Sequence, residues 1–390
     1  MIRSYRYPLH PTQAQAAALV SWLGSCCDLY NGALQERRDA WRKLGKSVSL
    51  YDQFKSLTEI RSTIDGWDTV PAVVARSALR RLDKAYVAFF RRVKTGQKPG
   101  FPRFRSRRRY DSVAIGSSAT QSERRCTLIR DGRVQLPKLG YVKFNQYRPL
   151  LGNVLDVVVR RETDKWFVIF QCDLGAAPAK IELATVTPAR VVGSVVGLTT
   201  LATLSTGEGI ANPRHGRKAA KRVAAAQRCL ARKQRGSKSR RRAVVTLQRA
   251  YAHVRNQRLD TARKAAAVLV SRYDVICFED LNIAGLAAGM LGKHVTDAAW
   301  GLLISATTCK AESAGKHVVA VDPRGTTIDC SGCGTAVPKR LDERIHKCPA
   351  CGFTIGRDVN AAINIKTRGM RVLGLLATQR VTDEGLTASA

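Results

Sequence analysis

The sequence predicts an α/β multidomain fold with an inserted zinc ribbon, and three observations support that expectation. Short apolar segments typical of strands alternate with longer segments of helical period over most of the 390 residues. Acidic residues stand at the ends of several of these elements, an arrangement that suggests a ribonuclease-H-like core. Near the C-terminus, two Cys-x-x-Cys pairs are separated by fourteen residues. A chain of this length, 45% of it apolar, can bury the cores of two or three domains.

The chain is strongly positive, with 66 Lys and Arg against 30 Asp and Glu and a formal charge of +36. Such an excess repels itself unless a polyanion covers it, so nucleic acid is the expected partner. A membrane surface is the alternative. However, no basic amphipathic segment adjoins an apolar anchor, and no apolar run reaches about 18 residues. No membrane partner is therefore expected.

The cysteines favour a reducing compartment. Four of the eleven form the two pairs, and the remaining seven are scattered and odd in number, which does not suit a disulfide framework. The first residues also lack the apolar core of a signal peptide. We therefore expect a cytoplasmic protein.

The N-terminal part reads as one strand followed by helices. Alternation over residues 2–7 predicts a short strand ended by Pro8. Helices are predicted over residues 14–34, 51–64 and 71–93. In the third helix, apolar residues as far as Phe90 are expected to face a core while arginines face outward. That basic face fits two interpretations equally well: the solvated surface of a helical bundle, or a surface that follows a nucleic-acid backbone.

The segment 98–110 is basic and aromatic, and its prolines and glycine deny it a helix. On extended chain, Phe101, Phe104 and Tyr110 are placed to stack on bases while the arginines pair with phosphates. The nucleic-acid-binding candidates are Arg103, Arg105, Arg107, Arg108 and Arg109. A plain linker is the alternative.

Residues 111–173 predict short strands with turn signals between them. We expect a small β-barrel that the N-terminal strand completes. Residues 175–188 read as a linker, and residues 191–205 as a strand, a glycine turn and a second strand.

Residues 214–264 carry eighteen Lys and Arg and one acid, Asp260, in a helical pattern broken at Gly236. At that density a plain solvated face is the weaker interpretation. Arg240, Arg241 and Arg242 are therefore further candidates for binding nucleic acid. Beyond them, Thr296 and Asp297 are expected to cap the helix that follows.

The pairs Cys330/Cys333 and Cys348/Cys351 are each followed by glycine. Such knuckles turn the backbone while four sulfurs close a tetrahedron around zinc. Four unrelated buried cysteines are the alternative, but both the spacing and the glycines would then be accidents. A zinc ribbon with structural Zn²⁺ is the prediction.

Two carboxylates are candidates for a catalytic metal site. Glu279 ends a predicted buried strand, and Asp358 begins a helix just after the ribbon. In a ribonuclease-H-like core, three or four carboxylates hold two Mg²⁺ that activate water and stabilise the leaving oxygen. The alternatives are a solvated loop acid for Glu279 and an N-cap for Asp358.

The chain resembles the TnpB family, the RNA-guided DNA nucleases of insertion sequences, over nearly its whole length. The motifs that carry the resemblance are YRYPLHPTQAQ, LYNGAL, GFPRFRSRRRYDS, GLTTLATLSTGE, ICFEDLNIAGL, VTDAAWG, CKAESAGKHVVAVDP, the two cysteine pairs and RDVNAAINI. The resemblance implies a RuvC-type nuclease domain with an inserted zinc ribbon, a helical recognition lobe and a wedge-like β-barrel. It also implies a guide RNA and a double-stranded target DNA with a short flanking motif. A bacterial or archaeal protein associated with the nucleoid is expected.

The resemblance also implies domain boundaries. The wedge-like barrel would comprise residues 1–10 and 108–175, the recognition lobe 11–107, the RuvC-like domain 189–325 and 354–378, the ribbon 326–353, and a tail 379–390.

The family's catalytic Glu corresponds to Glu279 and its last catalytic Asp to Asp358, but the first catalytic Asp is absent. The family pattern there is roughly Gly-Ile-Asp-Leu-Gly-Leu, and the Asp position holds Val195. A second departure is Gly356, where the family often has an acid. Valine has no lone pair for a metal, so Mg²⁺ binding is expected to be weak or absent.

Three hypotheses follow for function. The first is an RNA-guided, nuclease-dead DNA-binding protein that represses transcription. The second is an active, Mg²⁺-dependent RNA-guided endonuclease of a transposon that uses a displaced acid. The third is a decayed transposon relic.

Overall fold

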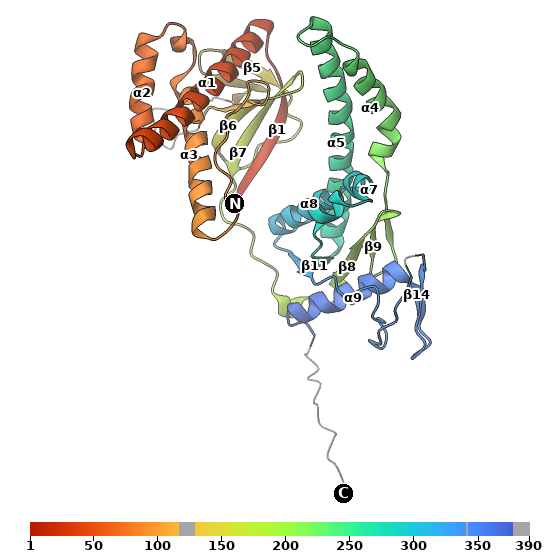
Figure 1. The fold of residues 1–390 in the computed structure, drawn as a ribbon. Helices are drawn as coiled ribbons and strands as arrows, with labels where there is room; N and C mark the ends of the chain where they lie inside the picture. The colour runs from red at the N-terminus through yellow and green to blue at the C-terminus, as the bar shows by residue number, and fades with distance from the viewer. Residues whose placement is uncertain (117–128, 341, 377–390) are drawn as a thin grey trace. The chain divides into compact units, whose positions relative to one another are not determined.

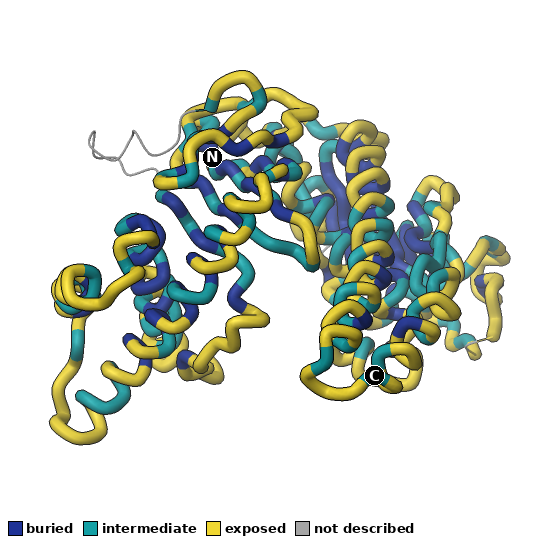
Figure 2. The backbone as a smooth tube through the Cα atoms, turned by 90° about the horizontal axis from the view of Figure 1, so that it is seen from above, coloured by how far each residue is buried: buried dark blue, intermediate teal, exposed yellow. Residues whose placement is uncertain are grey.

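The computed structural model describes residues 1–116, 129–340 and 342–376, which form two compact units, Met1–Ala176 and Ala177–Ala390 (Figure 1). The predicted tail 379–390 and part of the predicted barrel lie outside the described residues. Buried residues concentrate in the strands and in the helix faces that cover them (Figure 2). No helix in the described ranges is long and apolar enough to cross a bilayer.

The first unit contains a seven-stranded antiparallel sheet in the order β2-β6-β7-β1-β5-β4-β3. Its strands are β1 (Ile2–His10), β2 (Ser112–Ala114), β3 (Ile129–Arg130), β4 (Arg133–Leu136), β5 (Gly140–Phe144), β6 (Asn153–Glu162) and β7 (Lys165–Asp173). The N-terminal strand β1 lies between β5 and β7, so the prediction that it joins this sheet is confirmed, but it continues past Pro8 to His10. Closure into a barrel is not seen: β2 and β3 are edges, and no pairing within the described ranges joins them.

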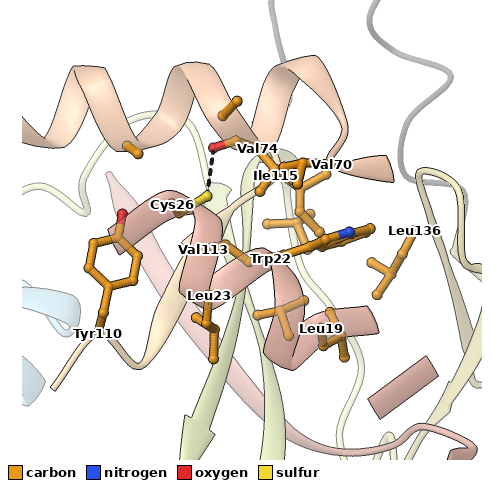
Figure 3. Close-up of a cluster of buried hydrophobic side chains, with 14 of the residues drawn as sticks. Leu19, Trp22, Leu23, Cys26, Val70, Val74, Tyr110, Val113, Ile115 and Leu136 are labelled. Atoms are coloured by element: carbon orange, nitrogen blue, oxygen red, sulfur yellow. Dashed lines mark hydrogen bonds between the residues drawn. The ribbon is translucent and has the colours of Figure 1, made fainter. Parts of the chain in front are cut away.

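This unit has three helices, α1 (Gln13–Leu44), α2 (Leu50–Thr63) and α3 (Ala72–Lys94), and a 3₁₀ turn, η1 (Trp67–Thr69). Helices α1 and α3 pack on the sheet, and α2 packs on α3. Capping boxes at Thr12 and Ser49 begin α1 and α2, because each side chain accepts the N–H three residues on. Trp22 and Cys26 of α1 lie in the buried cluster of Figure 3, where the Cys26 thiol lies 3.6 Å from the Val74 carbonyl oxygen of α3.

Two expectations for aromatic residues in this unit are wrong. Phe90 is 61% exposed, because it lies beyond the part of α3 that the core covers. Tyr110 is 1% exposed, and its ring lies against Tyr30 and under the Arg81 guanidinium. Tyr110 is therefore a core residue and is not available to stack on a base.

The second unit is built on a mixed sheet in the order β10-β9-β8-β11-β12. Its strands are β8 (Val191–Val196), β9 (Thr200–Leu204), β10 (Gly209–Ala211), β11 (Val275–Glu279) and β12 (His317–Val321). Strand β11 lies between β8 and β12 and runs parallel to both, while β8, β9 and β10 pair antiparallel. The 3₁₀ turns η3 (Leu183–Thr185) and η4 (Pro188–Arg190) precede β8.

Helices cover both faces of this sheet. The helices of this unit are α4 (His215–Ala231), α5 (Lys238–Arg272), α6 (Ile283–Ala288), α7 (Gly292–Ala298), α8 (Trp300–Ser313) and α9 (Arg357–Val372), of which α4 packs on α5 and not on the sheet. One core joins the sheet to α5 and α8, and a second joins it to α9, which lies across β8 and β11 (Figure 1). A Cβ on Gly193 of β8 would collide with the Ala362 carbonyl oxygen of α9, so only glycine permits this close approach. The short strands β13 (Ile345–Lys347) and β14 (Thr354–Gly356) form the ribbon.

The predicted helical break near Gly236 separates α4 from α5 as expected. The predicted cap at Thr296 and Asp297 is wrong. Asp297 lies inside α7, and its carboxylate accepts the N–H groups of Gly216 and Arg217 at the start of α4. The helix that follows begins after Ala299 without a side-chain cap.

Candidate functional site

The cysteines of the two Cys-x-x-Cys pairs converge on one point. All four Sγ atoms lie within 4.8 Å of one another, with 3.5 Å between Cys333 and Cys348 and 3.7 Å between Cys330 and Cys351. Tetrahedral zinc at about 2.3 Å from each sulfur separates two sulfurs by about 3.8 Å. The donor set and its spacing therefore fit a structural Zn²⁺, which these four cysteines would hold.

The backbone forms a tight turn, or knuckle, at each Cys-x-x-Cys pair. Gly334 and Gly352 have φ of 80° and 71°, the left-handed region that glycine adopts freely. Their N–H groups donate to the carbonyl oxygens of Cys330 and Cys348 at 2.8 and 3.0 Å, which closes each turn. Hydrogen bonds from the Thr335 side chain and backbone lower the pKa of the Cys333 thiol to about 6, which favours the thiolate that zinc binds.

Two asparagines of α9 attach the ribbon to this helix. Asn360 is fully buried, accepts the Ser331 N–H at 2.9 Å and donates to the Asp329 carbonyl oxygen at 2.8 Å. Asn364, one turn later, donates to the carbonyl oxygens of Thr326 and Asp329. These anchoring residues were not predicted, although the i, i+4 spacing of two amides on one helix is the signal that could have found them.

The two predicted carboxylates lie near each other, as expected. Glu279 ends β11, and alternation along the strand places it on the α9 face, where Cys277 also packs. The Thr326 hydroxyl donates to Glu279 Oε1 at 2.7 Å. Burial raises the pKa of Glu279, the bond from Thr326 and the charge of Arg368 oppose that rise, and the Asp358 carboxylate adds to it. Asp358, in the first turn of α9, is therefore an electrostatic neighbour of Glu279.

Val195 lies on the same face of the sheet as these acids. It is 9% exposed and belongs to the core that contains Cys277, Ala361 and Ala362. The register pairs the preceding residue, Ser194, with Phe278 of β11, so Val195 is level with the strand end that carries Glu279. The Val195 side chain therefore contributes two methyl groups to the face of the sheet on which Glu279 lies.

A fixed cation adjoins the acids. The Arg368 guanidinium donates to Asp329 Oδ2 at 2.8 Å and to the carbonyl oxygens of Asp322 and Arg324. Its charge favours ionised Glu279. Asp329, another acid of this region, is thus paired with an arginine.

The five arginine candidates of segment 98–110 are exposed, but they do not share one environment. Arg107 forms an ion pair with Asp28, and the Arg105 guanidinium lies 5.3 Å from the centre of the Tyr30 ring. The Arg105 N–H donates to Asn31 Oδ1 at 2.8 Å, which holds the segment on α1. Within the described ranges, no ion pair engages the remaining three, Arg103, Arg108 and Arg109.

The arginine candidates of the second group, residues 240–242, also differ in their environments. Arg240 donates to the carbonyl oxygens of Leu230 and Lys233 at 3.0 and 2.9 Å, so it closes the end of α4. Arg241 and Arg242 are exposed on α5. Two of the three arginines therefore remain available to a polyanion.

These features define a class: an α/β protein in which a Cys₄ module of the zinc-ribbon type lies beside a pair of carboxylates, in a strongly basic chain. Three family models match it. Residues 300–365 match the "Cas12f1-like, TNB domain", residues 162–289 a "Probable transposase", and residues 1–46 a "Helix-turn-helix domain". The last description does not fit the structure, where these residues form β1 and α1.

Two relatives align over almost the whole chain. A "Putative RNA-guided DNA endonuclease" of Streptomyces pristinaespiralis is 32% identical over 94% of this chain and 89% of its own length. The "Putative RNA-guided DNA endonuclease InsQ" of Escherichia coli K12 is 27% identical over 95% of this chain and 93% of its own. The "CRISPR-associated DNA-binding protein Cas12m" of Allomeiothermus silvanus is 32% identical over 30% of this chain and 24% of its own. The chain belongs to the TnpB family, as its motifs predicted.

Proposed function

We propose that this chain is an RNA-guided DNA-binding protein that does not cut its target. A guide RNA pairs with a double-stranded DNA site beside a short flanking motif, and the bound complex represses transcription by occupying a promoter. The observation that carries the proposal is Val195, an aliphatic residue on the face of the sheet where Glu279 and Asp358 lie.

The physical argument concerns charge. Two Mg²⁺ ions close together require several anionic oxygens, and an acid at position 195 would supply one that reaches both. Valine removes that anion, while Arg368 adds a positive charge next to Glu279. A loss of several kcal/mol of interaction with the metals slows cleavage by at least about 10³-fold, because 1.36 kcal/mol corresponds to a factor of ten. Magnesium binding is accordingly weak or absent.

Binding depends on different residues. Phosphate contacts are distributed over many Lys and Arg, and the chain retains its charge of +36. Arg103, Arg108 and Arg109 in the first unit and Arg241 and Arg242 in the second are exposed for such contacts. The near-full-length relatives are named as RNA-guided, which supports a guide RNA and a DNA target as partners. The Cys₄ cluster supports a structural Zn²⁺.

We assign the domains accordingly. The mixed sheet, with acids on one face and helices on both, supports a RuvC-type domain over 189–325 and 354–378, interrupted by the ribbon at 326–353. The open antiparallel sheet, within 1–10 and 108–175, is the wedge, and residues 11–107 are the helical recognition lobe.

A second candidate is an active RNA-guided endonuclease, which the printed names of the two near-full-length relatives favour. It requires another acid to replace the one missing at position 195. Asp329 is available on the segment that contacts Glu279, provided that it leaves Arg368.

The deciding experiment purifies the chain with its bound RNA, sequences that RNA, and offers the complex a supercoiled plasmid with the matching site in Mg²⁺. We expect specific, salt-dependent binding without nicking. Cleavage that disappears in Glu279→Gln would instead establish the endonuclease. Deleting the guide gene should raise a neighbouring transcript, and an unchanged transcriptome would leave the relic as the remaining explanation.

A further inference from the structure

A concave basic surface lies on the turn that follows β8. It has a volume of about 550 Å³ and is lined by Thr199, Asn212, Pro213, Arg214, Arg217 and Lys218. We refer to these six residues as the basic hollow. Three cations and no acid line it. Thr199 stands four residues after Val195, so the hollow adjoins the end of the strand that carries the substituted position.

Hydrogen bonds hold one wall of the hollow in place. The Asn212 side chain donates to the Leu198 carbonyl oxygen at 2.8 Å and accepts the Arg214 N–H at 3.2 Å. Arg214 has left-handed backbone angles, φ 50° and ψ 51°, directly before α4. The turn after β8 and the start of α4 are thereby joined through one amide, so the cations are presented from a fixed backbone.

The Asp297 carboxylate, which contacts the Arg217 backbone, is already engaged. Asp297 accepts the N–H groups of Gly216 and Arg217 at 2.6 and 2.9 Å and pairs with Arg258 at 2.9 Å. These donors hold the pKa of Asp297 below its usual range against the opposing effect of burial, so it stays ionised and bound to them. In the described part of the chain, no ion pair engages the exposed side chains of Arg217 and Lys218.

The residues that line the basic hollow indicate which kind of ligand it binds. Guanidinium and ammonium groups with amide and hydroxyl donors suit a phosphate, which guanidinium can bind through two parallel hydrogen bonds. No aromatic ring lines the hollow on which a base could stack. The recognised group is therefore the sugar–phosphate backbone and not a base.

We propose that the basic hollow binds a phosphodiester of a nucleic-acid strand and so holds that strand next to the remnant acid site. This inference rests on the proposed function for the presence of such a strand. The strand is either the guide RNA or one strand of the DNA target, since both supply the same phosphate.

The test compares Arg217→Ala/Lys218→Ala with Lys221→Ala/Arg222→Ala in the full-length chain. Both pairs are exposed on α4 and remove the same charge, but only the first pair lines the hollow. Dissociation constants are measured for 20-nucleotide single-stranded RNA and DNA between 50 and 300 mM salt. Each lost phosphate contact to a single strand reduces the slope of log K, the binding constant, against log salt concentration by about 0.7. Two lost contacts therefore weaken binding about tenfold at 0.15 M salt. We expect this loss in the hollow variant and a clearly smaller loss in the control.

A second measurement uses the unmodified chain. Lys218 should be protected from acetylation by bound oligonucleotide, while Lys221 stays reactive. A loss confined to RNA or to DNA identifies the strand, and equal losses indicate that either backbone is accepted. Equal behaviour of the two variants, or an unprotected Lys218, would overturn the hollow as a phosphate site while leaving RNA-guided binding intact. If the unmodified chain binds no nucleic acid, the proposed function fails as well.

Discussion

The most direct test of the proposed lack of cleavage is to introduce a carboxylate by Val195→Asp. Aspartate is close to valine in size, and position 195 faces the side of the sheet on which Glu279 and Asp358 lie. The substitution would bring three carboxylates to this face. Val195→Asn is the matched control, because it has nearly the same shape and loses the same methyl groups without adding a charge.

The structure sets the expected magnitudes. Val195 is 9% exposed, so either substitution forfeits about 1.5–3 kcal/mol of apolar burial. Without metal, Val195→Asp also brings a third anion close to Glu279, whose pKa burial and Asp358 already raise, so this variant should be the less stable of the two. If a variant binds Mg²⁺ only in its folded state, Mg²⁺ at 100 times its dissociation constant would raise the free energy of unfolding by about 2.7 kcal/mol.

The assay has two readouts. Thermal unfolding with and without Mg²⁺ should show metal-dependent stabilisation of Val195→Asp that the asparagine control and the unmodified chain lack. Plasmid cleavage by the RNA-bound complex should be at least about 10³-fold faster for Val195→Asp than for the unmodified chain. The reasoning is refuted if the unmodified chain cuts as fast as the variant, or if Val195→Asp binds Mg²⁺ no better than Val195→Asn.

Three further predictions follow from named contacts. Burial raises the pKa of Glu279 above its ordinary 4.5, so the Glu279 carboxyl group binds its proton more tightly in the folded chain than in the unfolded chain. The folded chain therefore loses stability as the pH rises through the folded-state pKa of Glu279. Glu279→Gln in magnesium-free buffer should therefore gain melting temperature relative to the unmodified chain above about pH 4.5, and a pH-independent difference would contradict this reasoning. Cys348→Ser should abolish bound zinc, measured by metal analysis, whereas Cys229→Ser, at an exposed cysteine outside the cluster, should not. Gly193→Ala should destabilise by several kcal/mol in denaturant unfolding, because its Cβ would collide with α9. Gly24→Ala, with open space in α1, should stabilise by about 1 kcal/mol.

The sequence predicted the features that depend on short spacing. Two cysteines three residues apart, each pair followed by glycine, encode a knuckle locally, so the Cys₄ cluster follows from the spacing alone. The place of β1 in the sheet and the break between α4 and α5 also follow from pattern and turn residues. Glu279 and Asp358 could each be placed at the end of an element, but only the packing of α9 on β11 makes them neighbours.

The features that were missed depend on partners far along the chain. The sequence did not show that Arg107, a candidate for binding nucleic acid, pairs with Asp28, 79 residues earlier. Asp297 was expected to cap the next helix and instead caps α4, 81 residues earlier. Tyr110 looked like an aromatic in an exposed basic loop, yet it packs against Tyr30. The type of a residue alone does not reveal these contacts, because each contact depends on which part of the chain packs against that residue in the folded protein.

The survival of Glu279 and Asp358 does not by itself argue for catalysis. Glu279 accepts from Thr326, the Thr326 carbonyl oxygen accepts from Asn364, and Asn360 holds the backbone on both sides of the first ribbon cysteine. The residues that surround the acids therefore also attach the zinc ribbon to α9. A chain that keeps its ribbon for binding would retain this network whether or not a metal ever occupies the acid site. Position 195 has no such second role beyond apolar packing, since its side chain contributes only to the core beneath α9. Under the proposed function, the residue at position 195, and not Glu279 or Asp358, therefore carries the distinction between binding and cleavage.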